Sequence, residues 1–213
     1  SDELTDLPTR TRLLQHVAQV LDYTWRSEHH ATLIQLNIDR FKNINDTLGH
    51  DAANSLLVQL AQRLTAVADE FGGIVARSGG DDFVILDGST RTYDDARQRV
   101  ELVSSMLATP FAIDNETIFV TASIGVAVAP RNRTISAEEL MRRADIATHR
   151  AKADGRNRTV VFDDSMQSTL THRMDVEHAL HGAVGRQELR LYYQPIVDLD
   201  RGLLTGFEAL IRR

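Results

Sequence analysis

Residues 74–86 read Ile74-Val75-Ala76-Arg77-Ser78-Gly79-Gly80-Asp81-Asp82-Phe83-Val84-Ile85-Leu86. Two short apolar runs enclose a polar centre, which predicts a β-hairpin with Gly79–Asp82 at its tip. Glycines allow a backbone to come close to a ligand, and adjacent carboxylates at a turn can bind a divalent metal through oxygen. Glycine and aspartate are also the commonest residues of ordinary turns, so the tip taken alone favours a plain turn.

The segments on either side of this hairpin alternate between helical and strand-like patterns. Apolar residues at helical spacing predict helices over residues 10–25, 53–67, 96–107 and 137–152. Apolar runs and period-two alternation predict strands over residues 31–38, 111–113, 117–128 and 160–162, with a polar turn at residues 39–43. This order of elements predicts an α/β (α+β) domain in which helices pack on a mainly antiparallel sheet.

The composition narrows the classes of function. The chain has 213 residues, 42% hydrophobic and 25% charged, as expected for a globular domain with additional segments. The net charge of −6 comes from interspersed charges of both signs, so no basic face for nucleic acid is expected, whereas a small phosphate ligand needs only a few local cations. The chain contains no cysteine, which excludes disulfides and thiolate chemistry.

The sequence also bears on membrane contact and on the start of the chain. No apolar run approaches the length of a membrane span, so no membrane contact is expected from this segment. Structured-looking sequence starts directly at Ser1, which suggests a piece of a longer protein in which a sensor or a membrane anchor could come first.

Two more segments could bind phosphate. The turn after the first predicted strand offers the backbone amides of Arg40, Phe41 and Lys42, which could cradle phosphate oxygens, although a solvated loop has the same residue types. Lys152 and Arg156 flank Gly155 just past a helix end, where two cations could clamp a triphosphate. Basic residues at that place also complement the helix dipole in ordinary proteins.

Together these segments resemble one family, the GGDEF domains of diguanylate cyclases. The resemblance covers residues 2–162 in the family's order. It rests on the N-terminal Asp2-Glu3-Leu4-Thr5, on Asp39-Arg40-Phe41-Lys42-Asn43-Ile44-Asn45-Asp46-Thr47-Leu48-Gly49-His50, on Arg77-Ser78-Gly79-Gly80-Asp81-Asp82-Phe83, on Thr121-Ala122-Ser123-Ile124-Gly125, and on Ala144-Asp145 through Lys152 with Gly155-Arg156-Asn157. It implies a palm-like nucleotidyl-cyclase fold with a central, mainly antiparallel sheet flanked by helices.

The resemblance also implies chemistry. Diguanylate cyclases join two GTP molecules into cyclic di-GMP with Mg²⁺, across two domains that meet face to face as a homodimer. Asp81 and the Ile38 carbonyl would be metal ligands, and Asp82 would act at the attacking hydroxyl or bind a second metal. Asn45 would bind guanine. The remaining nucleotide contacts would come from Arg40, Phe41, Lys42, Gly79, Gly80, Lys152 and Arg156.

The chain departs from the family's pattern at the substrate site. The principal metal aspartate aligns with Asn37, and an amide brings no charge to magnesium. The second guanine-binding aspartate aligns with Asn54, beside Ala53 in place of glycine. Asp82 is one methylene shorter than the usual glutamate, and a misplacement of about 1 Å can cost on the order of 10²-fold in rate. The family's product-inhibition motif is replaced by residues 70–73, so no feedback site of that kind is expected.

The tail carries a second resemblance. Residues 163–187 are polar with sparse apolar positions and predict a linker helix. Residues 188–213 contain Leu191-Tyr192-Tyr193-Gln194-Pro195-Ile196-Val197 and Gly206-Phe207-Glu208-Ala209-Leu210-Ile211-Arg212, which resemble the first strands of an EAL phosphodiesterase barrel. There Glu208 would be a metal ligand, and Gln194 and Arg212 would face the cyclic dinucleotide. This piece is too short to bury a core of its own.

The expected parent is therefore a bacterial, cytoplasmic tandem GGDEF–EAL signalling protein, with domains at residues 1–162 and 188–213 joined by residues 163–187. The favoured interpretation is a GTP-binding GGDEF domain with weak or lost cyclase activity that regulates the attached EAL domain. Two alternatives remain: a working cyclase, and a dimerisation domain that binds no nucleotide. The expected partners are GTP, a second copy of the chain and the remainder of the EAL domain.

Overall fold

A computed structural model describes residues 1–114, 116–129, 135–166 and 190–212. The chain divides into two compact units, Ser1–Met166 and Gln167–Arg213, which are described separately. None of the described helices is both long and apolar enough to cross a membrane.

The first unit is built on a five-stranded sheet with the order β2-β3-β1-β6-β7. Its strands are β1 (His30–Ile38), β2 (Ile74–Gly79), β3 (Asp82–Thr90), β6 (Ala122–Val128) and β7 (Arg158–Val161). Neighbouring strands run antiparallel except β6 and β7, which are parallel. β1 occupies the centre because residues 31–38 are buried on both faces of the sheet. The predicted mainly antiparallel sheet is confirmed.

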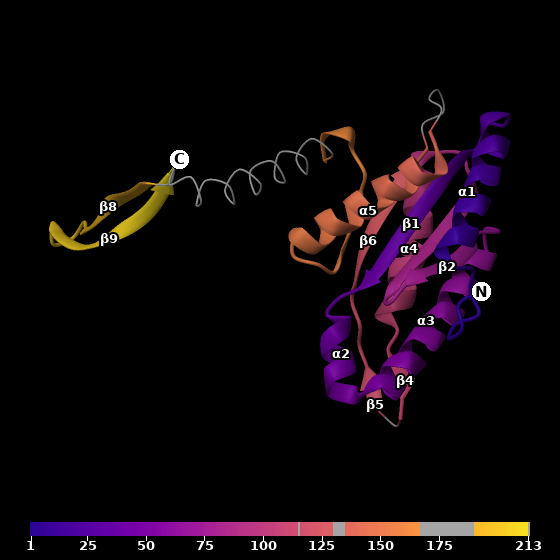
Figure 1. Ribbon diagram of the computed structural model, residues 1–213, viewed down its shortest axis with the longest axis horizontal. Helices are drawn as coiled ribbons and strands as arrows, with labels where there is room; N and C mark the ends of the chain where they lie inside the picture. The colour runs from indigo at the N-terminus through magenta and orange to yellow at the C-terminus, as the bar shows by residue number, and fades with distance from the viewer. Residues whose placement is uncertain (115, 130–134, 167–189, 213) are drawn as a thin grey trace. The chain divides into compact units, whose positions relative to one another are not determined.

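Helices cover both faces of the sheet (Figure 1). On one face, α1 (Arg10–Trp25) and α5 (Ala137–Ala153) bury an apolar cluster that includes Leu13, Leu33 and Leu140. On the other, α3 (His50–Asp69) and α4 (Tyr93–Ala108) bury a larger cluster around Leu56 and Phe83. The four predicted helices are confirmed; α1 has the predicted ends, and the ends of the other three differ somewhat.

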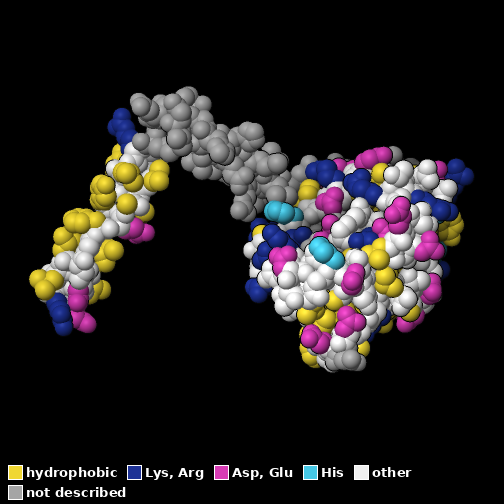
Figure 2. Space-filling model, turned by 60° about the horizontal axis from the view of Figure 1, so that its bottom comes forward, with side chains coloured by type: hydrophobic (Ala, Val, Ile, Leu, Met, Phe, Trp, Pro, Cys, Tyr) yellow, Lys and Arg dark blue, Asp and Glu magenta, His cyan; other side chains and the backbone are white. Residues whose placement is uncertain are grey.

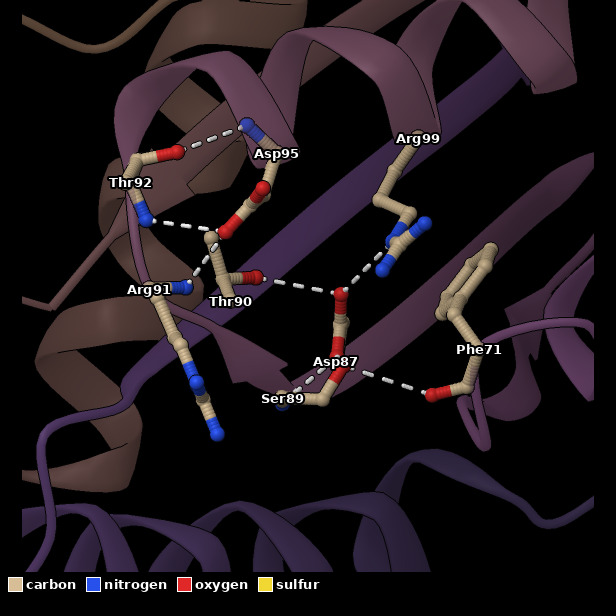
Figure 3. A network of polar contacts seen from close by, with 8 residues as sticks. All are labelled: Phe71, Asp87, Ser89, Thr90, Arg91, Thr92, Asp95 and Arg99. Carbon is tan, nitrogen blue, oxygen red and sulfur yellow. Dashed lines mark hydrogen bonds and ion pairs between the residues drawn. The ribbon is translucent and has the colours of Figure 1, made fainter.

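α4 begins three residues earlier than the apolar pattern predicted. Thr92 accepts a hydrogen bond from the Asp95 backbone, and the Asp95 carboxylate accepts one from the Thr92 backbone, so the two residues form a capping box. A buried carboxylate, Asp87, lies beside this cap and accepts hydrogen bonds from Ser89 and Thr90 (Figure 3). The polar residues before Ala96 therefore initiate the helix.

Three sequence predictions were wrong in detail. The predicted strand over 117–128 is two strands, because β5 (Glu116–Ile118) pairs with β4 (Phe111–Ile113) in a separate hairpin, and only β6 joins the main sheet. Phe119, between them, is 74% exposed. The predicted polar turn at 39–43 is shorter, since α2 (Phe41–Leu48) starts within it. The last strand covers Arg158–Val161 instead of 160–162.

The second unit contains an antiparallel hairpin of β8 (Arg190–Asp198) and β9 (Leu203–Arg212). Gln194 faces Glu208 across it. Many of its apolar side chains are exposed, among them Leu191, Tyr193 and Phe207, and Figure 2 shows hydrophobic side chains along the visible face of the hairpin. Most of the predicted linker helix, residues 167–187, lies outside the described residues.

Candidate nucleotide site

Three strands bring the predicted metal residues together at the end of β1. Asn37 lies opposite Asp82 of β3 and opposite Ser123 of β6. Because directly opposed residues of antiparallel strands point to the same face, these three side chains form a polar row on the face that α5 covers. The Ile38 backbone N–H donates to the Asp81 carbonyl at 3.4 Å, which ties the hairpin tip to the end of β1.

Asn37 and Asp82 are hydrogen-bonded to each other. The Asn37 side chain is buried, and its Nδ2 lies 2.7 Å from Asp82 Oδ1. An ionised carboxylate only accepts hydrogen bonds, so the amide must present its NH₂ group to Asp82. Burial raises the pKa of Asp82 above its ordinary value; the hydrogen bond from Asn37 opposes the rise, and the neighbouring Asp81 charge adds to it.

The hairpin tip has open space beside its two glycines and is held in place by Arg77. Gly79 and Gly80 have φ angles of 133° and 54°, and a Cβ atom added at either position would meet no other atom within 4 Å. Arg77 donates from Nη2 to the Gly80 carbonyl at 2.6 Å and from Nη1 to Asp2 Oδ1 at 2.8 Å. Burial raises the pKa of Asp2, but hydrogen bonds from Arg77 and Thr5 outweigh it and hold this pKa at about 2. The N-terminal motif thus anchors the tip.

The opposite side of the site offers anion-binding groups. Arg40 has a left-handed backbone with φ of 55°, and its carbonyl accepts from the backbone N–H groups of Asn43 and Ile44 at the start of α2. Among the described residues, the N–H groups of Phe41 and Lys42 have no hydrogen-bond acceptor. Free N–H groups at a helix N-terminus bind phosphate oxygens well, as the sequence predicted for this segment.

Four basic side chains belong to the predicted site. No hydrogen bond or ion pair to the side chains of Arg40, Lys42, Lys152 or Arg156 is found within the described parts of the chain. Lys152, near the end of α5, is close enough to Asp82 to lower its pKa. On the face shown in Figure 2, basic and acidic side chains are interspersed, so a ligand on this face would meet a few neighbouring cations and not a broad basic surface.

The two residues predicted to bind guanine lie on consecutive helices. Asn45 is in α2 and Asn54 is in the second turn of α3, with Gly49 between the helices at a φ of 86°. Neither side-chain amide has a hydrogen-bond partner among the described residues. Glu208, the metal ligand predicted for the EAL segment, lies in the second unit and is not part of this site.

The donor set is poor for magnesium. Asp81 and Asp82 could supply carboxylates and Ile38 a carbonyl, but the neighbouring Asn37 brings an uncharged amide, whose NH₂ faces Asp82. Among the residues that the structure describes, no group of three or more His, Cys, Asp or Glu side chains could hold a metal ion. Magnesium prefers charged oxygen ligands, so this arrangement fits it weakly.

Two polar residues on or next to β1 also contribute to the site and were not predicted from the sequence. Gln35 Nε2 donates to Asp145 Oδ1 of α5 at 2.6 Å, and Asp39 accepts three hydrogen bonds, from Thr121, Ser123 and the Asn157 backbone. The available signal was the period-two spacing of Gln35, Asn37 and Asp39 in a segment that is otherwise mostly apolar.

Comparisons with known proteins identify the family of the chain. Residues 1–158 match the family described as diguanylate cyclase, GGDEF domain. The chain is 34% identical over 213 residues to the signalling protein YkoW of Bacillus subtilis, covering 99% of this chain and 26% of YkoW. It is also 34% identical over 211 residues to MucR of Pseudomonas aeruginosa, named a bifunctional diguanylate cyclase/cyclic di-GMP phosphodiesterase, covering 99% of this chain and 30% of MucR. The chain thus spans less than a third of either relative.

Solved structures show the same fold. The GGDEF domain of YfiN (TpbB) from Pseudomonas aeruginosa superposes with a TM-score of 0.75 at 28% identity, over 80% of this chain and 98% of that one. The GGDEF domain of DgcB from Caulobacter crescentus, solved with cyclic di-GMP, gives a TM-score of 0.68 at 25% identity, over 76% and 94% of the two chains. With the matched residues, the shared fold and the clustered motifs, this chain belongs to the GGDEF family of diguanylate cyclase domains.

Proposed function

We propose that residues 1–162 form a GTP-binding GGDEF domain whose cyclase activity is weak or lost, and that it regulates an EAL phosphodiesterase domain that starts at residues 188–213. GTP would be the ligand of the first domain, and Mg²⁺ would bind only weakly beside it. Residues 163–187 would carry the regulatory signal between the domains. The pathway is cyclic di-GMP signalling, to which the GGDEF family belongs.

The contact between Asn37 and Asp82 carries the proposal. At 2.7 Å, the Asn37 amide donates to an oxygen that a metal would otherwise use. An amide at Asn37 in place of a third carboxylate has two effects on Mg²⁺ binding. It brings no negative charge, and its NH₂ group occupies an oxygen of Asp82, so both effects lower the affinity for Mg²⁺. Mg²⁺ would supply charge stabilisation to the transferring phosphoryl group, and a site that holds it weakly turns over slowly.

The groups that would bind the phosphates of the nucleotide are intact. The α2 N-terminus keeps free N–H groups at Phe41 and Lys42, and the side chains of Lys152 and Arg156 have no protein partner in the described residues. These contacts depend on backbone geometry and cations, which the substitutions at Asn37 and Asn54 leave in place. GTP binding is therefore expected to be kept even where cyclase activity is lost.

The EAL assignment draws on the relatives and on the hairpin. MucR is named bifunctional and NbdA of Pseudomonas aeruginosa is named a cyclic di-GMP phosphodiesterase, and each aligns with 99% of this chain, β8 and β9 included. Leu191, Tyr193 and Phe207 are exposed on the hairpin. A two-stranded hairpin with apolar side chains on its surface needs further structure to cover it.

A working cyclase is the second candidate. Asp81 and Asp82 remain at the tip, and Lys152 remains close to Asp82. The name of MucR includes diguanylate cyclase activity. In this case two copies of the chain would meet transiently to join their GTP molecules.

A combined assay separates these functions. The chain is incubated with GTP and Mg²⁺, cyclic di-GMP is measured by chromatography, and GTP binding is measured by calorimetry on the same sample. We expect binding with little or no product. Rapid formation of cyclic di-GMP would identify a working cyclase and refute the proposal, while an absence of both binding and product would leave a dimerisation role.

A further inference from the structure

The turn that carries Arg156 has an unusual backbone. Gly155, Arg156 and Asn157 have φ angles of 114°, 63° and 46° in succession. The left-handed region is costly for residues with a Cβ atom, so two such residues in a row are held there only when surrounding contacts compensate for the cost. Asn is among the residues that tolerate this region best, whereas Arg is not.

One side chain supplies that compensation. Asp39 Oδ2 accepts a hydrogen bond from the Asn157 backbone N–H at 2.9 Å and from Thr121 Oγ1 at 2.7 Å, and Oδ1 accepts from Ser123 Oγ at 2.7 Å. Asp39 is buried, and its own N–H donates to the Thr121 carbonyl at 2.8 Å. Hydrogen bonds to an ionised acceptor are stronger than neutral ones, so the turn is fastened firmly to the end of β1.

The other contacts of the turn hold its two ends, where it leaves α5 and where Arg158 of β7 pairs with Ser123 of β6. The Arg156 N–H donates to the Ala151 carbonyl at 3.0 Å, and the Arg156 carbonyl accepts from Arg158 Nε at 3.2 Å. Neither contact reaches β1. Asp39 is followed directly by Arg40 and by the start of α2, which is proposed to bind phosphate. The bond from Asn157 to Asp39 therefore fixes the position of the turn relative to the start of α2.

We infer that Asp39 is a positioning residue that holds Arg156 beside the start of α2, so that the guanidinium and the α2 N–H groups act on one polyphosphate. The inference depends on the proposed GTP binding. Without the Asp39 bond, the strained turn relaxes and the Arg156 side chain, which has no other partner in the described residues, no longer converges with Phe41 and Lys42. The affinity for the phosphates falls even though Asp39 does not touch them.

The test is a double-mutant cycle on GTP affinity, measured by calorimetry with the full chain and Mg²⁺. Asp39→Ala is expected to weaken GTP binding roughly tenfold to a hundredfold, the scale of a misplaced contact of about 1 Å. In an Arg156→Ala background the same substitution should have little further effect, because the two changes remove one interaction. Asp39→Asn should retain most of the affinity, since its amide oxygen can face Asn157 while its NH₂ faces the Ser123 hydroxyl.

Asp87→Ala is the matched control. Asp87 is also a buried carboxylate that accepts from a backbone N–H and two hydroxyls, but it lies opposite Thr32, at the far end of β1 from Asp39. The substitution should destabilise the fold without changing GTP affinity. If Asp39→Ala does not fold, the exchange rate of the Asn157 backbone amide hydrogen is measured in the unaltered chain instead. Slow exchange would support the hydrogen bond to Asp39, and rapid exchange would refute it.

The outcomes are distinguishable. Equal losses from Asp39→Ala with and without Arg156 would show a general structural effect and overturn the inference, as would unchanged GTP affinity in Asp39→Ala. A chain that binds no GTP at all would overturn the proposed function and this inference together.

Discussion

At the scale of single residues, buried carboxylates in this domain are stable only because several donors surround each of them. Asp87 is 0% exposed and accepts from Ser89, Thr90 and Arg99, whose guanidinium also lies over the Phe71 ring at 4.7 Å (Figure 3). Asp87→Ala leaves these donors without an acceptor and is expected to lower the free energy of unfolding by about 3–5 kcal/mol. Urea unfolding followed by circular dichroism measures this, and a loss below about 1 kcal/mol would contradict it.

Asp2 gives a pH-dependent prediction. Its pKa in the folded state is about 2, below the ordinary value of 3.8, so folding favours the charged form. The stabilisation is fully present well above pH 3.8 and is lost as the pH falls toward 2. Asp2→Asn should therefore lower the Tm at about pH 6 by a few degrees, and the difference from the unaltered chain should shrink at about pH 2.5. An equal difference at both pH values would contradict the role of the Asp2 charge.

At the scale of elements, the close packing of α5 on β6 positions the basic groups of the site. A Cβ at Gly125 would collide with the Thr148 backbone nitrogen and the Ala144 carbonyl of α5. Gly125→Val must push α5 away from the sheet, at a cost of about 1–3 kcal/mol or more, and should weaken GTP binding because α5 carries Lys152. Thermal unfolding and calorimetry measure both effects.

Gly206→Ala is the control for this substitution, because nothing lies within 4 Å of an added Cβ there and the residue belongs to β9 in the other unit. It should leave the Tm of the first unit and its GTP affinity unchanged. Retention of normal GTP affinity by a folded Gly125→Val variant would contradict the role assigned to α5.

The sequence predicted most elements because their periodicity is strong. The four long helices and the central hairpin follow directly from apolar spacing and from the turn at Gly79–Asp82. The break between β5 and β6 was not predictable, since the alternation continues through Phe119 and Val120 with no glycine or proline to mark it. The start of α4 was missed because its capping box is polar, although Thr92 and Asp95 have the spacing that would have revealed it.

The site was predicted less completely than the fold. Family resemblance drew attention to Asn37 and Asp82, but their hydrogen bond arises only because β1 and β3, which are distant in sequence, are neighbours in register. Asp39 was missed as a site residue since a polar residue at a strand end usually faces solvent. Three donors and near-complete burial distinguish it, and both are tertiary properties.

At the scale of the whole molecule, the domain has the GGDEF fold, and in the proposed site the phosphate-binding groups remain while Asn37 is hydrogen-bonded to Asp82. The scaffold motifs Asp2, Arg77 and Gly125 all have structural contacts that explain their residue types. The three residues that depart from the pattern implied by the resemblance, Asn37, Asn54 and Asp82, all belong to the proposed substrate site. Under the proposed function, the domain would bind GTP more readily than it converts it.

The most direct test is Asn37→Asp, with cyclic di-GMP measured at saturating GTP and Mg²⁺ and GTP binding measured in parallel. Restoring a charged ligand opposite Asp82 frees that carboxylate from the amide and strengthens magnesium binding. The expected result is a rise in product formation of about tenfold or more, equivalent to about 1.4 kcal/mol of activation free energy, with GTP affinity kept. Product formation no higher than in the unaltered chain, with GTP still bound, would show that Asn37 is not what limits the site.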